Sequence, residues 1–428
     1  MKFDKWTIGL AAAGVVSMGV VAVADESPVS TLVSGTTLNG YVDTSAIYKP
    51  GVQSAAYRFV NTAPDTWNGF NFNVVDLAIE KALDEGQWSA GYKADLWFGP
   101  QASGIPGSLG GNNFGVRAAY VALRAPVGNG LDFKVGQLYG VTGYESADSP
   151  YNPNFSRSLG FRLEPINYTG ITTTYQVADW IKVTGGIADS AYDGTNVKQT
   201  YDGTFSDGKF TSNGGAGNGT LTYVGAITLT APESMGVISG ATLTGGIVDN
   251  GISNGKNAMI YYVGTTVPTP IKEVTVGAAW DYNNNGGGNG TWATAIAGYV
   301  SWQVSEKMKL NGRVEFAKSN VNAWDIGPTV EKYNSDINDY DSVLLNSGAT
   351  RLFATTLTLD YALWANVITR LEVVWDHDLN GSGIFSSQYT VDEIDEVGSR
   401  AAAGIPGYSV VNGRNNSVLL AANIIYKF

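Results

Sequence analysis

The chain contains no cysteine and only one histidine, His377, among its 428 residues. Disulfides and thiolate chemistry are therefore excluded, and a zinc or other transition-metal site is disfavoured, because such sites are built mainly from cysteine and histidine. Charged residues are few, at 15%, and acidic ones outnumber basic ones, for a formal net charge of −12. This balance disfavours binding of nucleic acid. We expect no metal and no other cofactor.

Long apolar runs are missing as well. Beyond the first two dozen residues, no stretch approaches the roughly 18 uninterrupted apolar residues that a membrane-spanning helix needs. The chain has instead 54 glycines, 11% aromatic residues and only 14 prolines, a composition rich in turn and strand formers. This composition predicts an all-β protein, and a chain of this length fits a single large barrel.

The N-terminal segment has the features of a secretory signal peptide. Two lysines precede an apolar run that ends in an A-x-A cleavage motif formed by Ala22 and Ala24. The alternative is a permanent transmembrane helix, but glycines interrupt the run and Asp25 follows it at once. We expect export by the general secretory route, a cleaved signal peptide over 1–24, a short periplasmic lead over 25–36 and one barrel domain over 37–428.

The most frequent pattern is alternation at period two, which is typical of a β-strand with two different faces. In the segment 310–316, apolar side chains alternate with Asn311, Arg313 and Glu315. A soluble sandwich could show the same alternation with its apolar face inward. In a transmembrane barrel, the apolar face contacts lipid and the polar face lines the lumen.

About 16 such segments can be counted, each near the roughly 9 to 11 residues with which a tilted strand crosses a bilayer. The predicted strands are 37–48, 70–82, 88–98, 115–124, 131–141, 167–177, 181–191, 220–230, 238–249, 257–268, 274–284, 291–303, 308–318, 351–362, 367–377 and 414–428.

The connections between these segments alternate in length, which distinguishes a transmembrane barrel from a sandwich. Short ones, such as 83–87 and 178–180, alternate with long ones rich in Gly, Asn, Ser and Asp, such as 49–69, 142–166 and 319–350. Short periplasmic turns and long extracellular loops are typical of outer-membrane barrels. The sequence thus predicts an antiparallel up-and-down transmembrane β-barrel of about 16 strands, whose even strand count returns both termini to the periplasm.

The last predicted strand ends the chain with an aromatic residue. Tyr426 and Phe428 lie on its apolar face together with Leu420 and Ile424. In outer-membrane proteins such an ending is the recognition signal for the barrel assembly machinery, which we expect to be a partner of this chain.

The first half of the chain contains four distinctive stretches: LNGYVDTS from Leu38, NFNVVDLAIEKALDEGQWSAGYKADLWFG from Asn71, RAAYVALRAPVGNGLDFKVGQ from Arg117, and the segment between Tyr144 and Pro165. These stretches resemble the OmpL-like β-barrel porin family of bacterial outer membranes. The resemblance is close over 37–180. Beyond residue 180 it depends only on barrel periodicity and the terminal phenylalanine. It implies an outer-membrane channel and names no substrate.

Mixed charges in the third long loop, 142–166, are candidates for a pore constriction. If this loop folds into the lumen, as it does in general porins, it brings together Glu145, Asp148, Arg157, Arg162 and Glu164. Opposite charges across a narrow opening create a field that filters solutes by size and charge. The alternative is that these charges only pair and hold the loop in place.

Charged residues of both signs are also expected on the inward faces of the strands, where they would form the opposing wall. The candidates are Lys93, Asp95, Arg117, Asp132, Lys134, Arg313, Glu315, Arg370 and Glu372. Each of them could equally be a solvated wall residue without a role in selection. Excess acid gathers in the last long loop, at Asp392, Glu393, Asp395 and Glu396. It indicates a cation-favouring mouth or a divalent-cation contact with lipopolysaccharide.

We therefore expect a pore for passive diffusion of ions and small hydrophilic solutes, set in outer-membrane lipid and compatible with a homotrimer. About 16 strands enclose an aqueous channel, whereas about eight would fill with side chains. An enzyme is disfavoured because His377, expected on the lipid side or at the rim, has no nucleophile motif beside it. A TonB-dependent transporter would need a plug and about 22 strands. A plugged barrel that serves as an anchor or adhesin stays open as the alternative.

Overall fold

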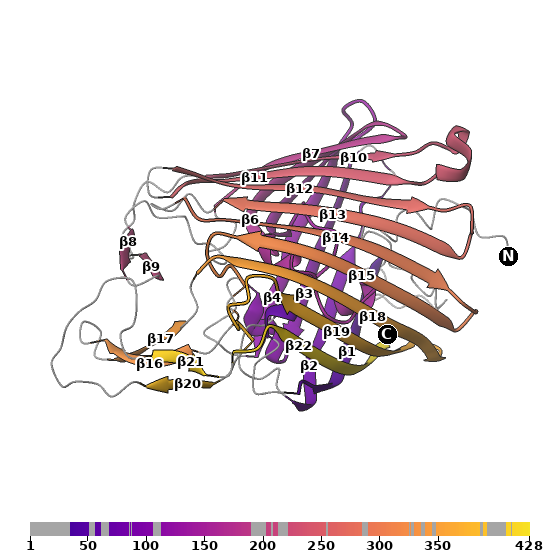
Figure 1. Ribbon diagram of the computed structural model, residues 1–428. Helices are drawn as coiled ribbons and strands as arrows, with labels where there is room; N and C mark the ends of the chain where they lie inside the picture. Colours follow the sequence, from indigo (N-terminus) through magenta and orange to yellow (C-terminus); the bar gives the residue numbers. More distant parts are fainter. Residues whose placement is uncertain are drawn as a thin grey trace.

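The computed structural model describes residues 35–50, 56–60, 68–84, 86, 88–105, 113–189, 203–206, 209–212, 221–253, 256–284, 290–324, 326, 329–334, 339–344, 348–385, 388–391, 408–411 and 413–428. Sixteen strands in these ranges form one closed barrel, in which every neighbouring pair is antiparallel (Figure 1). In order around the barrel they are β1 (Thr36–Tyr48), β2 (Gly69–Lys81), β3 (Ser89–Phe98), β4 (Phe114–Ala125), β5 (Leu131–Tyr139), β6 (Asn167–Ala178), β7 (Ile181–Ala188), β10 (Thr222–Thr230), β11 (Thr242–Ser253), β12 (Lys256–Pro268), β13 (Val274–Asn284), β14 (Trp292–Gln303), β15 (Met308–Ser319), β18 (Thr350–Trp364), β19 (Val367–Asp378) and β22 (Asn416–Lys427).

The first and last strands close the barrel. β1 pairs with β22, and Gly40 and Phe428 exchange two backbone hydrogen bonds of 3.1 Å each. Closure removes the edge strands, whose unpaired backbone groups would be costly in lipid. Among the described residues, no helix is long and apolar enough to cross a membrane.

The predicted strands are confirmed: each corresponds to one strand of the barrel. The largest offset is at β11, which was expected over 238–249 and is found over Thr242–Ser253, because the 3-10 helix η5 (Glu233–Ile238) occupies the turn before it. The predicted signal peptide with Ala22 and Ala24, the lead over 25–34 and the acidic residues of 392–396 lie outside the described residues.

Three two-stranded hairpins in the long loops were not predicted. They pair β8 (Gly203–Ser206) with β9 (Lys209–Ser212), β16 (Thr329–Asn334) with β17 (Asp339–Leu344), and β20 (Gln388–Val391) with β21 (Tyr408–Val411). Figure 1 places them beyond the ends of the barrel strands, on the side of the long loops. Each has strands of four to six residues, too short to show a clear period of two.

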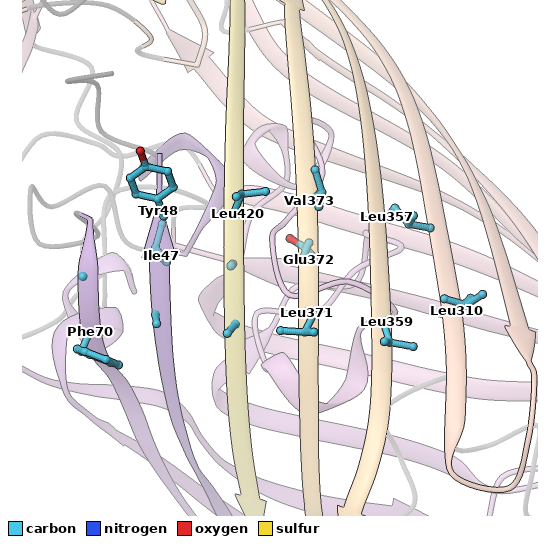
Figure 2. A pocket seen from close by; sticks show the side chains of 14 residues that line it. Ile47, Tyr48, Phe70, Leu310, Leu357, Leu359, Leu371, Glu372, Val373 and Leu420 are labelled. Carbon is cyan, nitrogen blue, oxygen red and sulfur yellow. The ribbon is translucent and has the colours of Figure 1, made fainter. Parts of the chain in front are cut away.

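Alternation along the barrel strands separates an apolar outer surface from a polar interior, as predicted. On β15, Val314 and Phe316 are 52% and 42% exposed, whereas Arg313 and Glu315 are each 1% exposed. A shallow aliphatic hollow of about 690 Å³ on the outer surface includes Leu357 and Leu420, and Figure 2 shows it across β1, β22, β19, β18 and β15. This hollow therefore belongs to the lipid side and not to the solute path.

Candidate functional site

The third loop, which covers 140–166 between β5 and β6 in the structure, folds into the barrel. It contains the short 3-10 helices η3 (Ser149–Tyr151) and η4 (Phe161–Leu163). At its centre Asn154, Ser156 and Arg157 are at most 1% exposed. Polar side chains of an outward-projecting loop would stay solvated, so this burial follows from their position between the walls of the barrel.

Carboxylates of the wall bind the backbone of this loop. Glu372 on β19 accepts hydrogen bonds from the backbone N–H groups of Phe155, at 2.7 Å, and Ser156, at 2.9 Å. Glu315 on β15 accepts one from the N–H of Leu159. The backbone N–H groups of a loop inside a barrel have no neighbouring strand to bind. These charge-assisted hydrogen bonds to wall carboxylates satisfy them instead.

Two wall arginines complement these carboxylates. Arg313 donates from Nη1 to Oε1 of Glu145 and from Nε to Oε2 of Glu315, both at 2.9 Å, and from Nη1 to the carbonyl of Ser156 at 2.8 Å. Arg370 donates to the carbonyls of Ser149 and Asn152, each at 2.9 Å. Four predicted wall residues, Arg313, Glu315, Arg370 and Glu372, thus hold the third loop and are covered by it.

A second loop segment also enters the lumen. Residues 56–60 of the first loop begin with the 3-10 helix η1 (Ala56–Arg58), and 57–60 are buried, with Arg58 at 0% exposure. Arg58 forms ion pairs with Glu315, at 2.8 Å, and with Asp376 on β19. Its carbonyl accepts the backbone N–H of Arg157 at 2.7 Å. Sequence reasoning missed this segment, and the only available signal was a Tyr-Arg-Phe run at 57–59 within a loop otherwise rich in small and polar residues.

The five charged candidates of the third loop are not gathered at one point. The side chain of Glu145 binds the barrel wall, where it also accepts a hydrogen bond from Tyr299 Oη at 3.1 Å. Arg157 donates instead to carbonyls of its own loop. Oδ2 of Asp148 lies 3.8 Å from Nη2 of Arg117 on β4. Arg162 is partly exposed within η4.

Glu164 lies at the end of the third loop, against β13. Burial and the neighbouring carboxylate of Asp281 raise the pKa of Glu164 well above its usual range. Two carboxyl groups in contact in a buried place are stable only when a proton lies between them. A proton shared between Glu164 and Asp281 therefore stabilises the contact of the loop end with the wall.

The wall on the side of β3 to β7 carries the other predicted charges. Lys93 pairs with Glu80 at 3.3 Å, and Arg124 binds Asp132 through two hydrogen bonds of 2.6 and 2.8 Å. Nζ of Lys134 lies 4.8 Å from the ring centroid of Tyr120. These residues keep some exposure and do not hold the loop.

Two other predicted residues of this wall are buried. Asp95, 3% exposed, accepts a hydrogen bond from Tyr139 Oη, and Arg117, 4% exposed, donates to the carbonyl of Ile166 at 3.0 Å. Toward the extracellular ends of β5 to β12 the inward residues are buried, and many of them are apolar, as at Leu138, Val224 and Ile260. The accessible polar part of this wall is thus its periplasmic half.

His377 lies at the long-loop end of β19. Its ring stacks on Trp375, and its Nδ1 is 2.9 Å from Oδ1 of Asn416. Within the described ranges, no group of three or more His, Cys, Asp or Glu side chains is placed to hold a metal ion.

A closed barrel with an apolar outer face, a polar interior and a loop folded into the lumen is the architecture of an outer-membrane porin. The chain belongs to the family described as "Putative beta-barrel porin-2, OmpL-like", whose model matches residues 35–404. It is a porin channel of the outer membrane, as the sequence predicts. Comparison of the sequence with curated proteins finds no match.

Solved porins have the same fold. An anion-selective porin from Comamonas acidovorans is similar over 92% of this chain and 99% of its own, with a TM-score of 0.56 and 12% identity. The outer membrane channel DcaP of Acinetobacter baumannii has a TM-score of 0.54 at 12% identity, over 92% of this chain and 97% of its own. OmpT of Vibrio cholerae has a TM-score of 0.52 at 11% identity, over 92% of this chain and 97% of its own. At these identities the similarity establishes the fold.

Proposed function

We propose that small hydrophilic solutes diffuse passively beside the inserted third loop and along the periplasmic half of the wall formed by β5, β6, β7 and β10. A contrast in exposure carries this proposal. Under the loop, the inward side chains of Asn311, Thr358 and Glu372 are at most 2% exposed. On the other side, Thr184 is partly exposed and Gln176 is exposed.

The chemistry of the accessible wall supports diffusion of hydrophilic molecules. Threonine hydroxyls meet in cross-strand pairs, with Oγ1 atoms 3.0 Å apart for Thr174 and Thr184 and 3.2 Å apart for Thr228 and Thr244. Hydroxyl groups both donate and accept hydrogen bonds, so they can replace part of a solute's hydration. Their short side chains also leave more of the lumen open than the arginines of the opposite wall do.

The absence of cysteine allows a direct test. Thr184→Cys places a thiol on the inward face of β7, and Ile187→Cys places one on the outward face, where Ile187 is 42% exposed. In planar bilayers, a cationic methanethiosulfonate should reduce the single-channel conductance of Thr184→Cys and leave that of Ile187→Cys unchanged. A folded barrel without conductance, or a thiol at 184 that does not react, would contradict the pathway and favour the plugged anchor.

We also propose that the porin assembles as a homotrimer. A solved form of OmpT, similar to this chain with a TM-score of 0.50, is described as a trimer. The outer hollow of Figure 2, whose lining also includes the small residues Ala46 and Ala422, offers a surface for a second copy. Ala422→Trp should fill the hollow and shift the mass measured by light scattering in detergent from trimer to monomer. Ala278→Trp, on the outward face of β13, is the control and should stay trimeric. A monomeric parent chain would contradict the proposal.

A further inference from the structure

We propose that the accessible wall carries an anion-attracting track formed by Lys93, Lys134 and Lys182, which makes small anions the preferred solutes of this pore. The inference rests on the diffusion pathway proposed above and adds the class of solute. It concerns three lysines on alternate strands, β3, β5 and β7, of which Lys182 was not among the predicted wall residues.

The three ammonium groups form one electrostatic cluster. Lys93 pairs in register with Tyr120 on β4, and Tyr120 pairs with Gly136, two residues from Lys134 on β5. Lys134 lies near enough to Lys93 and Lys182, and also to the carboxylates of Glu80 and Asp132, for their charges to interact. Lys134 is paired in register with Thr172, and Lys182 with Gln176 on one side and Thr228 on the other. All three lysines are partly exposed, so their charges face the accessible part of the lumen.

The carboxylates of Glu80 and Asp132 also act on Lys134, but they offset only part of the positive charge of this wall. Glu80 pairs with Lys93, and Asp132 is held by Arg124 through two hydrogen bonds. Among the described residues, Lys134 and Lys182 form no salt bridge. Asp76 and Asp95 are 6% and 3% exposed and face packed protein. The accessible surface therefore carries an excess of positive charge.

A local excess of positive charge decides the selectivity even though the whole chain is acidic, at −12. Salt screens charges over a Debye length of about 8 Å at physiological ionic strength, so distant acidic groups act weakly on an ion inside the lumen. The walls of the barrel have a low dielectric constant and concentrate the field of nearby charges. The partly exposed hydroxyl groups of Thr174 and Thr184 stand beside the track and can donate hydrogen bonds to an oxyanion.

The test compares two ways of removing two positive charges. Lys134→Gln with Lys182→Gln removes them from the track, and Lys272→Gln with Lys307→Gln removes them from exposed turns at the periplasmic end. Each pair is made in the full chain carrying Thr184→Cys. The readout is the ratio of thiol reaction rates with anionic sulfonatoethyl and cationic trimethylammonioethyl methanethiosulfonate, together with the reversal potential in a KCl gradient.

In the Thr184→Cys parent we expect the anionic reagent to react faster, on the order of tenfold, and the reversal potential to show anion preference. The track variant should lower the ratio to about one, the turn variant should keep it, and high salt should reduce it. Equal rates in the parent, or a ratio that the track variant does not change, would overturn the track and leave the pathway standing. A thiol that neither reagent reaches would overturn the pathway, and the track with it.

Discussion

Arg313 on β15 and Glu145 in the third loop form a buried ion pair, with 2.9 Å between Nη1 and Oε1 and side-chain exposures of 0% and 1%. The two residues are 168 positions apart in the chain. Arg313 also binds the carbonyl of Ser156, so one guanidinium group joins the barrel wall to both the side chain and the backbone of the loop. The position of the third loop and the stability of the barrel are therefore coupled.

Arg313→Gln should destabilise the whole barrel. Without the guanidinium group, Glu145 and part of the charge of Glu315 are left buried without a cation, which costs about 3–5 kcal/mol in the free energy of unfolding. Urea unfolding in detergent, followed by tryptophan fluorescence, measures this cost. Arg351→Gln removes an exposed arginine and should change the free energy by at most about 0.5 kcal/mol. Equal stability of the two variants would show that the pair does not hold the loop.

Arg58→Ala should expose the third loop to trypsin. The side chain of Arg58 binds Glu315 and Asp376 and donates from Nη1 to the carbonyl of Arg157 at 3.3 Å, and Arg157 is itself 1% exposed. If about 3 kcal/mol of pairing is lost, the population with an open loop rises about a hundredfold, and cleavage after Arg157 rises with it. Mass spectrometry of timed digests measures cleavage at this bond, with cleavage after the exposed Lys272 as the internal reference. An unchanged ratio of the two cleavages would mean that the first loop does not secure the third.

The contact of Glu164 with β13 should weaken as pH rises. Burial and the carboxylate of Asp281 raise the pKa of Glu164, whereas in an unfolded chain a glutamate has a pKa of about 4.3. The folded state therefore binds the extra proton, and its stabilising effect is complete below the unfolded pKa and is lost as pH rises through the folded pKa.

Glu164→Gln keeps a neutral hydrogen-bond donor at this position and should remove the pH dependence. As pH rises from mildly acidic to alkaline, we expect the midpoint of thermal unfolding of the unsubstituted chain to fall relative to that of the variant. Parallel curves for the two proteins would contradict the shared proton. Glu306→Gln, in an exposed turn, serves as a control for the change of net charge.

Phe428→Ser should reduce the amount of folded porin in the outer membrane of cells. The ring of Phe428 is 46% exposed, while its backbone forms the two hydrogen bonds with Gly40 that close the barrel. Its side chain is therefore available for recognition, and its replacement should affect refolding of purified protein in detergent little. Lys427→Gln, at the preceding exposed position, should assemble normally. Normal membrane levels of Phe428→Ser would exclude the assembly signal.

The strands, their faces and the even strand count could be predicted because these features are local. Side chains alternate at period two along each strand, so Val314 and Glu315 must face opposite sides once one face is buried. Turn-forming residues mark where strands end, as at the Ala365–Asn366 turn, where Asn366 has a φ of 63°. The sequence pattern also shows which charged residues face inward, but it does not show which residues they pair with.

Only the tertiary structure decided which inward charges hold a loop and which face the pathway. Arg313 and Lys134 have the same inward position in the sequence pattern, yet the first is covered by the third loop and the second is partly exposed. Arg58 and Asp376 meet across 318 positions of the chain, and Phe155 and Glu372 across 217. The sequence by itself determined an outer-membrane barrel, because alternation and turn chemistry act between neighbouring residues. The path through that barrel depends on ion pairs that exist only after closure has brought distant strands and loops together.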